Sequence, residues 1–310
     1  MLKKLFEVSG TIELLTKEIA YSGKLSTDKL KNVYHKIFLH KGEKIEVDKS
    51  LINKVFKYID SLGIKKGDIL IVHSSMEGMR KVDPQPEAII DYLLELVGSE
   101  GTLVFPAFPI INLKYDDTKI QTYNPKRTLC WTGMLPNTFL KYPGVIRSEF
   151  PFNTLAALGP HAKAMMRDNL SSDVPHGKNS SWAYCVEHHA KILYLGISIA
   201  ECNTVLHMAD DFLSDEWPIN NWYEKQKYNI KTEEGIIEKT IKVCSSFWVK
   251  YNVCYNFNAR LKRLGYLSET DVDGIIVGFC QDSKSMMDYV IEQARKGKIR
   301  YKIPRKYWKG

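Results

Sequence analysis

Three short apolar runs divide the chain into alternating strand and helix patterns. They cover residues 68–72, 101–106 and 191–196. An unbroken apolar run of this length is typical of a strand that is buried on both faces. Helical periodicity follows each run, most clearly over residues 86–97, where Pro86 suits the first helical turn. The alternation predicts an α/β fold, layered α/β/α around a central mixed sheet.

The rest of the chain adds helices and one antiparallel hairpin. We expect one or two amphipathic helices in an N-terminal segment over residues 1–46, a main domain over 47–297 and a basic tail over 298–310. Period-two alternation in the C-terminal half predicts a hairpin across Glu233, Glu234 and Gly235. Residues 109–131 show little periodicity and are predicted to form a long functional loop.

Charge is unevenly distributed along the chain. The 310 residues include 44 basic and 36 acidic ones, for a net charge of +8. Residues 291–310 alone carry eight basic groups against Glu292. This tail is predicted to be either a solvated terminus or a contact for phosphate groups of a ligand or a nucleic acid. No stretch approaches the roughly 20 apolar residues of a membrane span, and no secretory signal is evident, which predicts a cytoplasmic protein.

The most informative segment for chemistry is residues 203–211. Asn203 is a good helix N-cap, and a helix starting there places Thr204, His207 and either Asp210 or Asp211 on one face. That helix begins at the carboxyl end of the predicted strand 191–196, the edge where open α/β sheets bind ligands. A carboxylate that holds an imidazole fixes its tautomer and raises its basicity. The segment therefore predicts a general base at His207.

Other interpretations of the same residues remain open. His207 can simply fill a helix in the core. Cys202, next to the helix, can act as a nucleophile, although the six cysteines are scattered and predict neither a disulfide framework nor a zinc site. A metal enzyme would draw on His176, the adjacent histidines 188–189 and the aspartates 210–211, but their spacing fits no zinc or iron motif, so no metal is predicted.

Four segments, in chain order, resemble the aminoglycoside 3-N-acetyltransferase family. They are Ile71-Val72-His73-Ser74-Ser75, Gly101-Thr102-Leu103-Val104-Phe105-Pro106, Pro143-Gly144-Val145-Ile146-Arg147-Ser148 with Gly159 following, and Thr204-x-x-His207-x-x-Asp210. The last matches the family pattern with Asp in place of Glu. The resemblance covers about residues 65–215 and leaves the N-terminal segment and the basic tail outside it.

The resemblance implies a CoA-dependent N-acyltransferase domain (EC 2.3.1 type) over residues 47–297, with an acyl-CoA as co-substrate. His207 would take the proton of the attacking amine, Asp210 would orient the imidazole, and Thr204 would contact the thioester carbonyl or the departing thiolate. Backbone N–H groups of the turn would hold CoA or polarise the carbonyl. The implied CoA-binding residues are His73, Ser74, Ser75, Arg127, Thr128, Thr132 and Gly133.

The acceptor amine is less clear from the residues. The segment Arg147-Ser148-Glu149-Phe150-Pro151 departs from the family pattern, which has a histidine where this chain has Phe150. Glu149 and Asp211 are predicted to contact the acceptor. Because the tail is basic, we expect a nucleotide-linked amino sugar, with aminoglycoside inactivation as the alternative. The expected partners are this amine and the acyl-CoA, without nucleic acid or membrane, and a homo-oligomer is left open.

Overall fold

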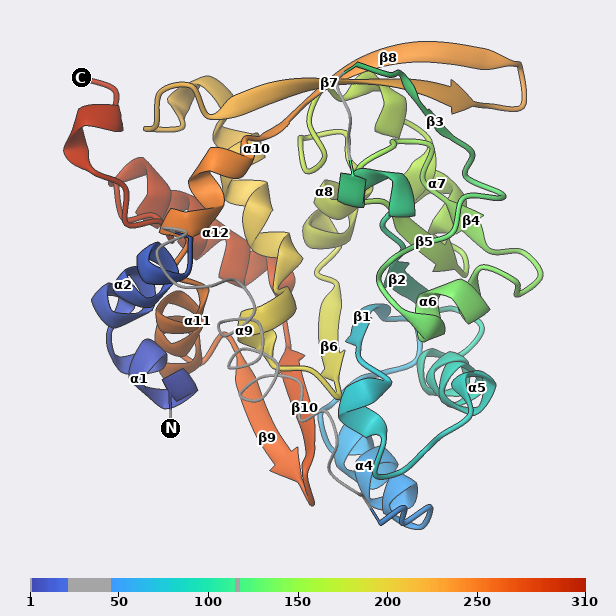
Figure 1. Cartoon of the computed structure of the whole chain (residues 1–310). Coiled ribbons are helices and arrows are strands. Elements are labelled where there is room, and N and C mark those ends of the chain that lie inside the picture. Colours follow the sequence, from blue (N-terminus) through green and yellow to red (C-terminus); the bar gives the residue numbers. More distant parts are fainter. Residues whose placement is uncertain (1, 22–45, 115–117) are drawn as a thin grey trace.

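The structure is a computed structural model that describes residues 2–21, 46–114 and 118–310 (Figure 1). The helices of these residues are α1 (Leu2–Val8), α2 (Gly10–Tyr21), α4 (Leu51–Asp60), α5 (Pro86–Val97), α6 (Met134–Phe139), α7 (Ala162–Met166), α8 (Ser181–Glu187), α9 (Ile199–Cys202), α10 (Met208–Leu213), α11 (Cys254–Arg263) and α12 (Ser283–Arg295). The predicted helix over 86–97 is confirmed at both ends. The N-terminal prediction for residues 22–45 lies outside the described residues.

A seven-stranded mixed sheet forms the centre of the molecule, in the order β4-β5-β2-β1-β6-β10-β9. Its strands are β1 (Ile69–Ser74), β2 (Thr102–Pro106), β4 (Ile146–Arg147), β5 (Leu155–Leu158), β6 (Lys191–Leu195), β9 (Ser268–Val272) and β10 (Ile275–Cys280). The three predicted strands are confirmed and pair in parallel, with β1 between β2 and β6. Antiparallel strands extend the sheet on both sides, which confirms the predicted mixed sheet.

Helices cover both faces of this sheet, because successive side chains of a buried strand point to opposite sides. Leu70 and Val72 of β1 pack into a core shared with α4, α5 and α6. Ile69 and Ile71 pack into a second core shared with α7, α8, α10, α11 and α12. Two apolar faces on one strand thus produce the predicted α/β/α layering.

A second sheet crosses one end of the molecule (Figure 1). The predicted hairpin is confirmed as β7 (Tyr223–Lys231) and β8 (Ile236–Cys244). A third strand, β3 (Gln121–Tyr123), pairs in parallel with β7. The prediction that residues 109–131 form only an irregular loop is therefore wrong for this part. Three residues are too few to show periodicity, and the partner strand lies about a hundred positions away along the chain.

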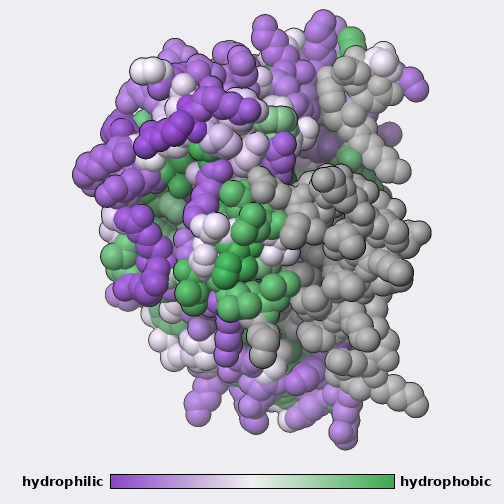
Figure 2. Space-filling model, turned by 60° about the vertical axis from the view of Figure 1, so that its left-hand side comes forward, coloured by the Kyte–Doolittle hydropathy of each residue, from purple (hydrophilic) through white to green (hydrophobic). Residues whose placement is uncertain are grey.

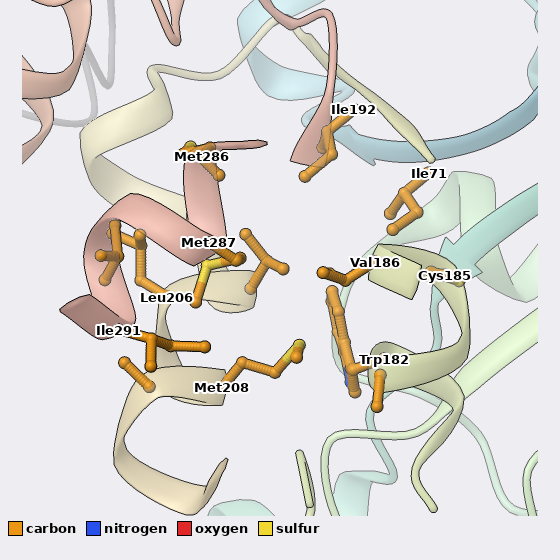
Figure 3. Close-up of a cluster of buried hydrophobic side chains, with 14 of the residues drawn as sticks. Ile71, Trp182, Cys185, Val186, Ile192, Leu206, Met208, Met286, Met287 and Ile291 are labelled. Carbon is orange, nitrogen blue, oxygen red and sulfur yellow. The ribbon is translucent and has the colours of Figure 1, made fainter. Parts of the chain in front are cut away.

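The second core holds the segment around residue 207 in place. Leu206 and Met208 are directed into a cluster with Met287 of α12 and Trp182 of α8 (Figure 3). Leu206 is 2% exposed and Met208 is 1% exposed. Fully burying an apolar side chain of this size stabilises the fold by about 1.5–3 kcal/mol. The residue between them is consequently anchored on both sides.

The prediction of a solvated basic tail is wrong for its first half. Arg300, Tyr301 and Ile303 are buried. The segment is held by β-bridges from Asn252 to Tyr301 and from Ile219 to Trp308. The prediction counted only charged residues, whereas the apolar side chains of Tyr301 and Ile303 pack into the core and hold the segment against the domain. The predicted boundaries at residues 46 and 297 remain predictions.

The N-terminal helices pack on α11 through a buried carboxylate. Glu13 of α2 is fully buried, and its carboxylate accepts from the backbone N–H groups of Tyr255 and Asn256 in α11 at 3.5 and 3.4 Å. In the view that brings this side forward, Figure 2 shows a group of hydrophobic side chains on a largely hydrophilic face. The exposed apolar residues of α1 and α2 are Leu5, Val8, Ile12 and Leu15. Within the part of the chain that the structure describes, every helix is too short or too polar to cross a bilayer.

Candidate active site

The segment after β6 is not the single helix that the sequence predicts. It consists of α9, a 3-10 turn over Thr204–His207 and then α10. Asn203 does not cap a helix with its side chain; its Oδ1 accepts from the Tyr194 hydroxyl at 2.7 Å. His207 ends the 3-10 turn and immediately precedes α10, where side chains three residues apart lie on one face of the helix. The predicted neighbours His207 and Asp210 therefore do meet, with Nδ1 and Oδ2 separated by 3.4 Å.

Asp211 does not orient His207, because it pairs with His176. Its Oδ2 accepts from Nδ1 of His176 at 2.8 Å and from the backbone N–H of the same residue at 3.0 Å. The imidazoles of His176 and His207 stack, with ring centroids 5.6 Å apart and an interplanar angle of 16°. The structure thus shows two imidazoles, each beside its own carboxylate. From the sequence, His176 was a candidate only as a metal ligand, because nothing local places it beside residue 207.

Arg300 completes this cluster from the C-terminal segment, for which the sequence predicted only a solvated terminus or a phosphate contact. Its Nη2 donates to Oδ2 of Asp210 at 2.9 Å and contacts Nδ1 of His207. Burial, followed by the guanidinium charge, lowers the pKa of His207 to about 4, against the opposing effect of Asp210. Asp210 raises the pKa of this imidazole as expected, but burial and the Arg300 charge outweigh it, so the net shift is downward. Arg300 forms an ion pair with Asp210 and places its own positive charge beside the imidazole, which disfavours protonation of the ring.

A cavity of about 460 Å³ opens at the carboxyl ends of β1 and β6. It brings together six residues of the predicted site, namely His73, Ser74, Ser75, Thr132, Gly133 and Thr204. Trp131, which is 45% exposed, also lines it. Because β1 and β6 are parallel, the loops that follow them meet at one edge of the sheet. His207 is not among the described residues that line the cavity; Thr204, which does line it, lies one 3-10 turn earlier in the chain.

Several side chains of the cavity wall are fixed in place. His73 is buried and stacks on Tyr194, with ring centroids 5.1 Å apart. Burial lowers the pKa of His73 to about 3, so this ring is neutral near pH 7. Its Nε2 has no hydrogen-bond partner among the described residues. The Thr132 hydroxyl donates to the Pro106 carbonyl at 2.7 Å. The wall is thus pre-formed and offers an unpaired ring nitrogen.

Three other predicted residues lie away from the cavity lining. Arg127 is exposed, and the Thr128 carbonyl accepts from Arg147. Glu149 lies near the β7–β8 hairpin, where burial and the nearby Glu233 and Glu234 raise its pKa. The described contacts place none of the three beside His207. Their predicted roles in CoA and acceptor binding remain predictions.

Comparison with known proteins identifies the family. The family model described as aminoglycoside 3-N-acetyltransferase matches residues 71–292. The chain belongs to this family. Aminoglycoside N(3)-acetyltransferase IX of Micromonospora chalcea is 30% identical over an alignment of 211 residues, which covers 57% of this chain and 71% of that protein. Aminoglycoside N(3)-acetyltransferase IV of a Salmonella species is 33% identical over 150 residues, covering 48% of this chain and 54% of the relative.

Solved structures of acetyltransferases share the fold. The apoenzyme of aminoglycoside acetyltransferase AAC(3)-IVa superposes with a TM-score of 0.66 at 24% identity, over 86% of this chain and 95% of that one. A binary complex of AAC-IIIb with CoASH gives a TM-score of 0.66 at 20% identity, over 84% and 99% of the two chains. Family membership confirms the predicted enzyme class, a CoA-dependent N-acyltransferase with an acyl-CoA as co-substrate.

Two rival chemistries receive no support from the geometry. Burial raises the pKa of the Cys202 thiol well above its usual range, and its Sγ contacts the Ser198 carbonyl at 3.5 Å. A thiol of this kind stays protonated and is a poor nucleophile. Among the residues that the structure describes, no three His, Cys, Asp or Glu side chains gather into a metal-binding group. His189, for example, pairs with Asp282 at the surface.

Proposed function

We propose that this protein transfers an acetyl group from acetyl-CoA to an amine of an aminoglycoside. One observation carries the proposal. The end of β1 at His73 and Ser74, the following Ser75 and the residue Thr204 line a single cavity, and His207 lies three residues beyond Thr204. A thioester bound along the end of β1 would have its reacting end near Thr204, three residues before His207 in the chain.

The names of the relatives and the charges of the C-terminal segment support an aminoglycoside as the acceptor. The matching relatives are named aminoglycoside N(3)-acetyltransferases, which favours the alternative over the nucleotide-linked amino sugar. The argument for a phosphate-bearing substrate depended on free cations in the tail. In the structure three of the eight cations of residues 291–310 pair with carboxylates: Arg300 with Asp210, Arg295 with Glu216, and Lys296 with Glu292. The positive charge available for a phosphate is therefore smaller than the count of basic residues indicates.

The proposed reaction is a direct transfer. The amine nitrogen attacks the thioester carbonyl carbon, the C–S bond breaks, and the amine proton passes to the thiolate by way of a base. His207 is the proposed base, Asp210 the carboxylate that orients it, and Thr204 a hydroxyl near the carbonyl oxygen. A positioned general base contributes roughly 10²–10⁴-fold to such a reaction. The N–H groups of the turn after β1 are the proposed donors to the polarised carbonyl.

Substrate profiling tests the reaction and the acceptor together. Purified protein is given acetyl-CoA and a panel of aminoglycosides, free amino sugars and nucleotide-linked amino sugars, and CoA thiol release is followed. We expect turnover with aminoglycosides. Turnover confined to nucleotide-linked sugars would reject the proposed acceptor, and no thiol release with any amine would reject the reaction.

The variant His207→Asn tests the centre of the site. We expect at least a hundredfold loss of kcat with unchanged binding of CoA. His189→Asn is the matched control, because this surface imidazole also pairs with an aspartate, Asp282, but lies outside the site. A His207→Asn enzyme that keeps more than about a tenth of the rate would contradict the role of His207.

A further inference from the structure

Arg300 occupies the position between the proposed base and its carboxylate. Its side chain is 5% exposed and that of Asp210 is 2% exposed, so the pair is shielded from water. Nη2 lies 2.9 Å from Oδ2 of Asp210 and 2.8 Å from the Tyr301 hydroxyl, and its shortest contact is with Nδ1 of His207. By contrast, Oδ2 of Asp210 is 3.4 Å from Nδ1 of His207. The ring nitrogen therefore contacts the guanidinium more closely than the carboxylate.

The direction of this contact follows from the chemistry of arginine. A guanidinium has only N–H donors and stays protonated in proteins. The nitrogen that it contacts must then be the acceptor, so Nδ1 of His207 carries a lone pair. In a neutral imidazole the proton is consequently on Nε2. A ring that takes the amine proton at Nε2 needs the opposite arrangement, with Nδ1–H directed to a carboxylate.

We propose that Arg300 is a positioning residue that acts through His207: it joins the imidazole to the short carboxylate of Asp210 and holds the resting ring as the Nε2–H tautomer. This inference rests on the proposed function only for its effect on rate. The guanidinium fills the gap that an aspartate, one methylene shorter than a glutamate, leaves in front of Nδ1. Base catalysis at Nε2 then requires the Nδ1 hydrogen bond to pass from Arg300 to Asp210.

The groups that face His207 determine the expected pH behaviour. They are Arg300, Asp210 and the stacked His176, whose own Nδ1 is held by Asp211. The Tyr301 hydroxyl adds a neutral contact to the same carboxylate at 3.5 Å. Arg300 lowers the pKa of His207 and Asp210 raises it. Removing the arginine therefore leaves the carboxylate as the dominant neighbour, and the pKa must rise.

The wild-type protein provides the first test, which needs no activity. Imidazole ¹H–¹⁵N correlation spectra of ¹⁵N-histidine-labelled protein show which nitrogen of His207 bears the proton, with His207→Asn used for assignment. We expect the proton on Nε2 at pH 7. A proton on Nδ1 would overturn the proposal, whatever the enzyme acylates. Failure of acetyl transfer with every amine would instead reject the proposed function and leave this result intact.

Three variants then separate positioning from packing. Arg300→Met is expected to move the proton of His207 to Nδ1 and raise its pKa by roughly 1–3 units, the usual effect of a charge a few ångströms away. The apparent pKa of the acid limb of the kcat/KM profile should rise by the same amount, because a general base is active only when it is unprotonated. Arg300→Lys keeps the buried charge and should shift the limb less. In Arg300→Met/Asp210→Glu the longer carboxylate should reach Nδ1 and recover the rate near pH 7.

The control is Arg305→Met in the same segment, where the guanidinium stacks on Trp308 5.0 Å from the ring centroid. It should change neither the tautomer nor the pH profile. A purely structural role of Arg300 predicts a lower Tm with the wild-type tautomer and acid limb, and this result would refute the proposal. If Arg300→Met does not fold, the Arg300→Lys profile and the wild-type spectrum decide. If the apparent pKa of the acid limb in Arg300→Lys rose by the same roughly 1–3 units as expected for Arg300→Met, the argument from charge would be contradicted.

Discussion

Gly78 controls how closely the turn after β1 approaches the end of β6. A Cβ built on Gly78 would lie 1.6 Å from the Gly196 carbonyl oxygen, whereas ordinary contacts of this kind begin near 3.4 Å. In Gly78→Ala the two segments must separate by roughly 1.8 Å, the difference between these distances. The first contact at risk is the backbone hydrogen bond from Ser75 N to the Leu195 carbonyl, which measures 2.9 Å.

The consequences for stability and for catalysis differ in size. Losing one backbone hydrogen bond lowers the free energy of unfolding by about 1 kcal/mol, and the steric clash adds about 1–3 kcal/mol. A displacement of about 1 Å in a reacting geometry costs roughly a hundredfold in rate. Ser75 lines the cavity, so kcat/KM for acetyl-CoA should fall by about that factor.

Kinetics of thiol release together with urea unfolding would measure both quantities. Gly67→Ala is the control, because a Cβ there meets nothing within 4 Å and only the positive φ of 92° opposes it. It should lower stability by about 1 kcal/mol and leave kcat/KM unchanged. Wild-type kinetics in Gly78→Ala would refute the reasoning, since they would mean that the turn tolerates the displacement without moving the site.

Two further predictions concern the cavity wall. Cys202→Ala should keep at least half of the wild-type kcat, because burial holds the thiol protonated; a hundredfold loss would restore the nucleophile hypothesis. His73→Phe should flatten the acid side of the stability profile. The folded pKa of His73, about 3, lies below the unfolded value of roughly 6.5, so its contribution is complete above pH 6.5 and is lost as the pH falls toward 3. Urea unfolding from pH 7 to 4 would measure the slope, and identical slopes in both proteins would contradict the prediction.

Local sequence signals predicted the elements that are defined by their own neighbours. The apolar runs correspond to β1, β2 and β6, and the helix over 86–97 is reproduced residue for residue. These predictions succeed because a strand buried on two faces or a helix buried along one stripe has a recognisable pattern of apolar residues in the sequence. The antiparallel strands β9 and β10 were not predicted, since β9 is largely exposed and β10 depends on pairing with β6.

The segment at 203–211 shows where local reasoning fails. Asn203 is a favourable N-cap by type, yet its side chain bonds to Tyr194 and Asn258, which come from β6 and α11. These long-range contacts turn a predicted helix into a 3-10 turn followed by α10. His207 and Asp210 still meet, because His207 immediately precedes α10 and a spacing of three puts both side chains on one face of that helix.

By itself, the sequence determined the α/β class, the family and six of the residues that line the cavity, because these depend on local periodicity and on short motifs. Only the tertiary structure decided the electrostatics of His207. Arg300, 93 positions away, contacts Nδ1 of its ring, and Asp211 pairs with His176 instead. The charge of a residue is visible in the sequence, but its partner is set by packing across the whole domain. Burial then makes that partner's effect on the pKa large.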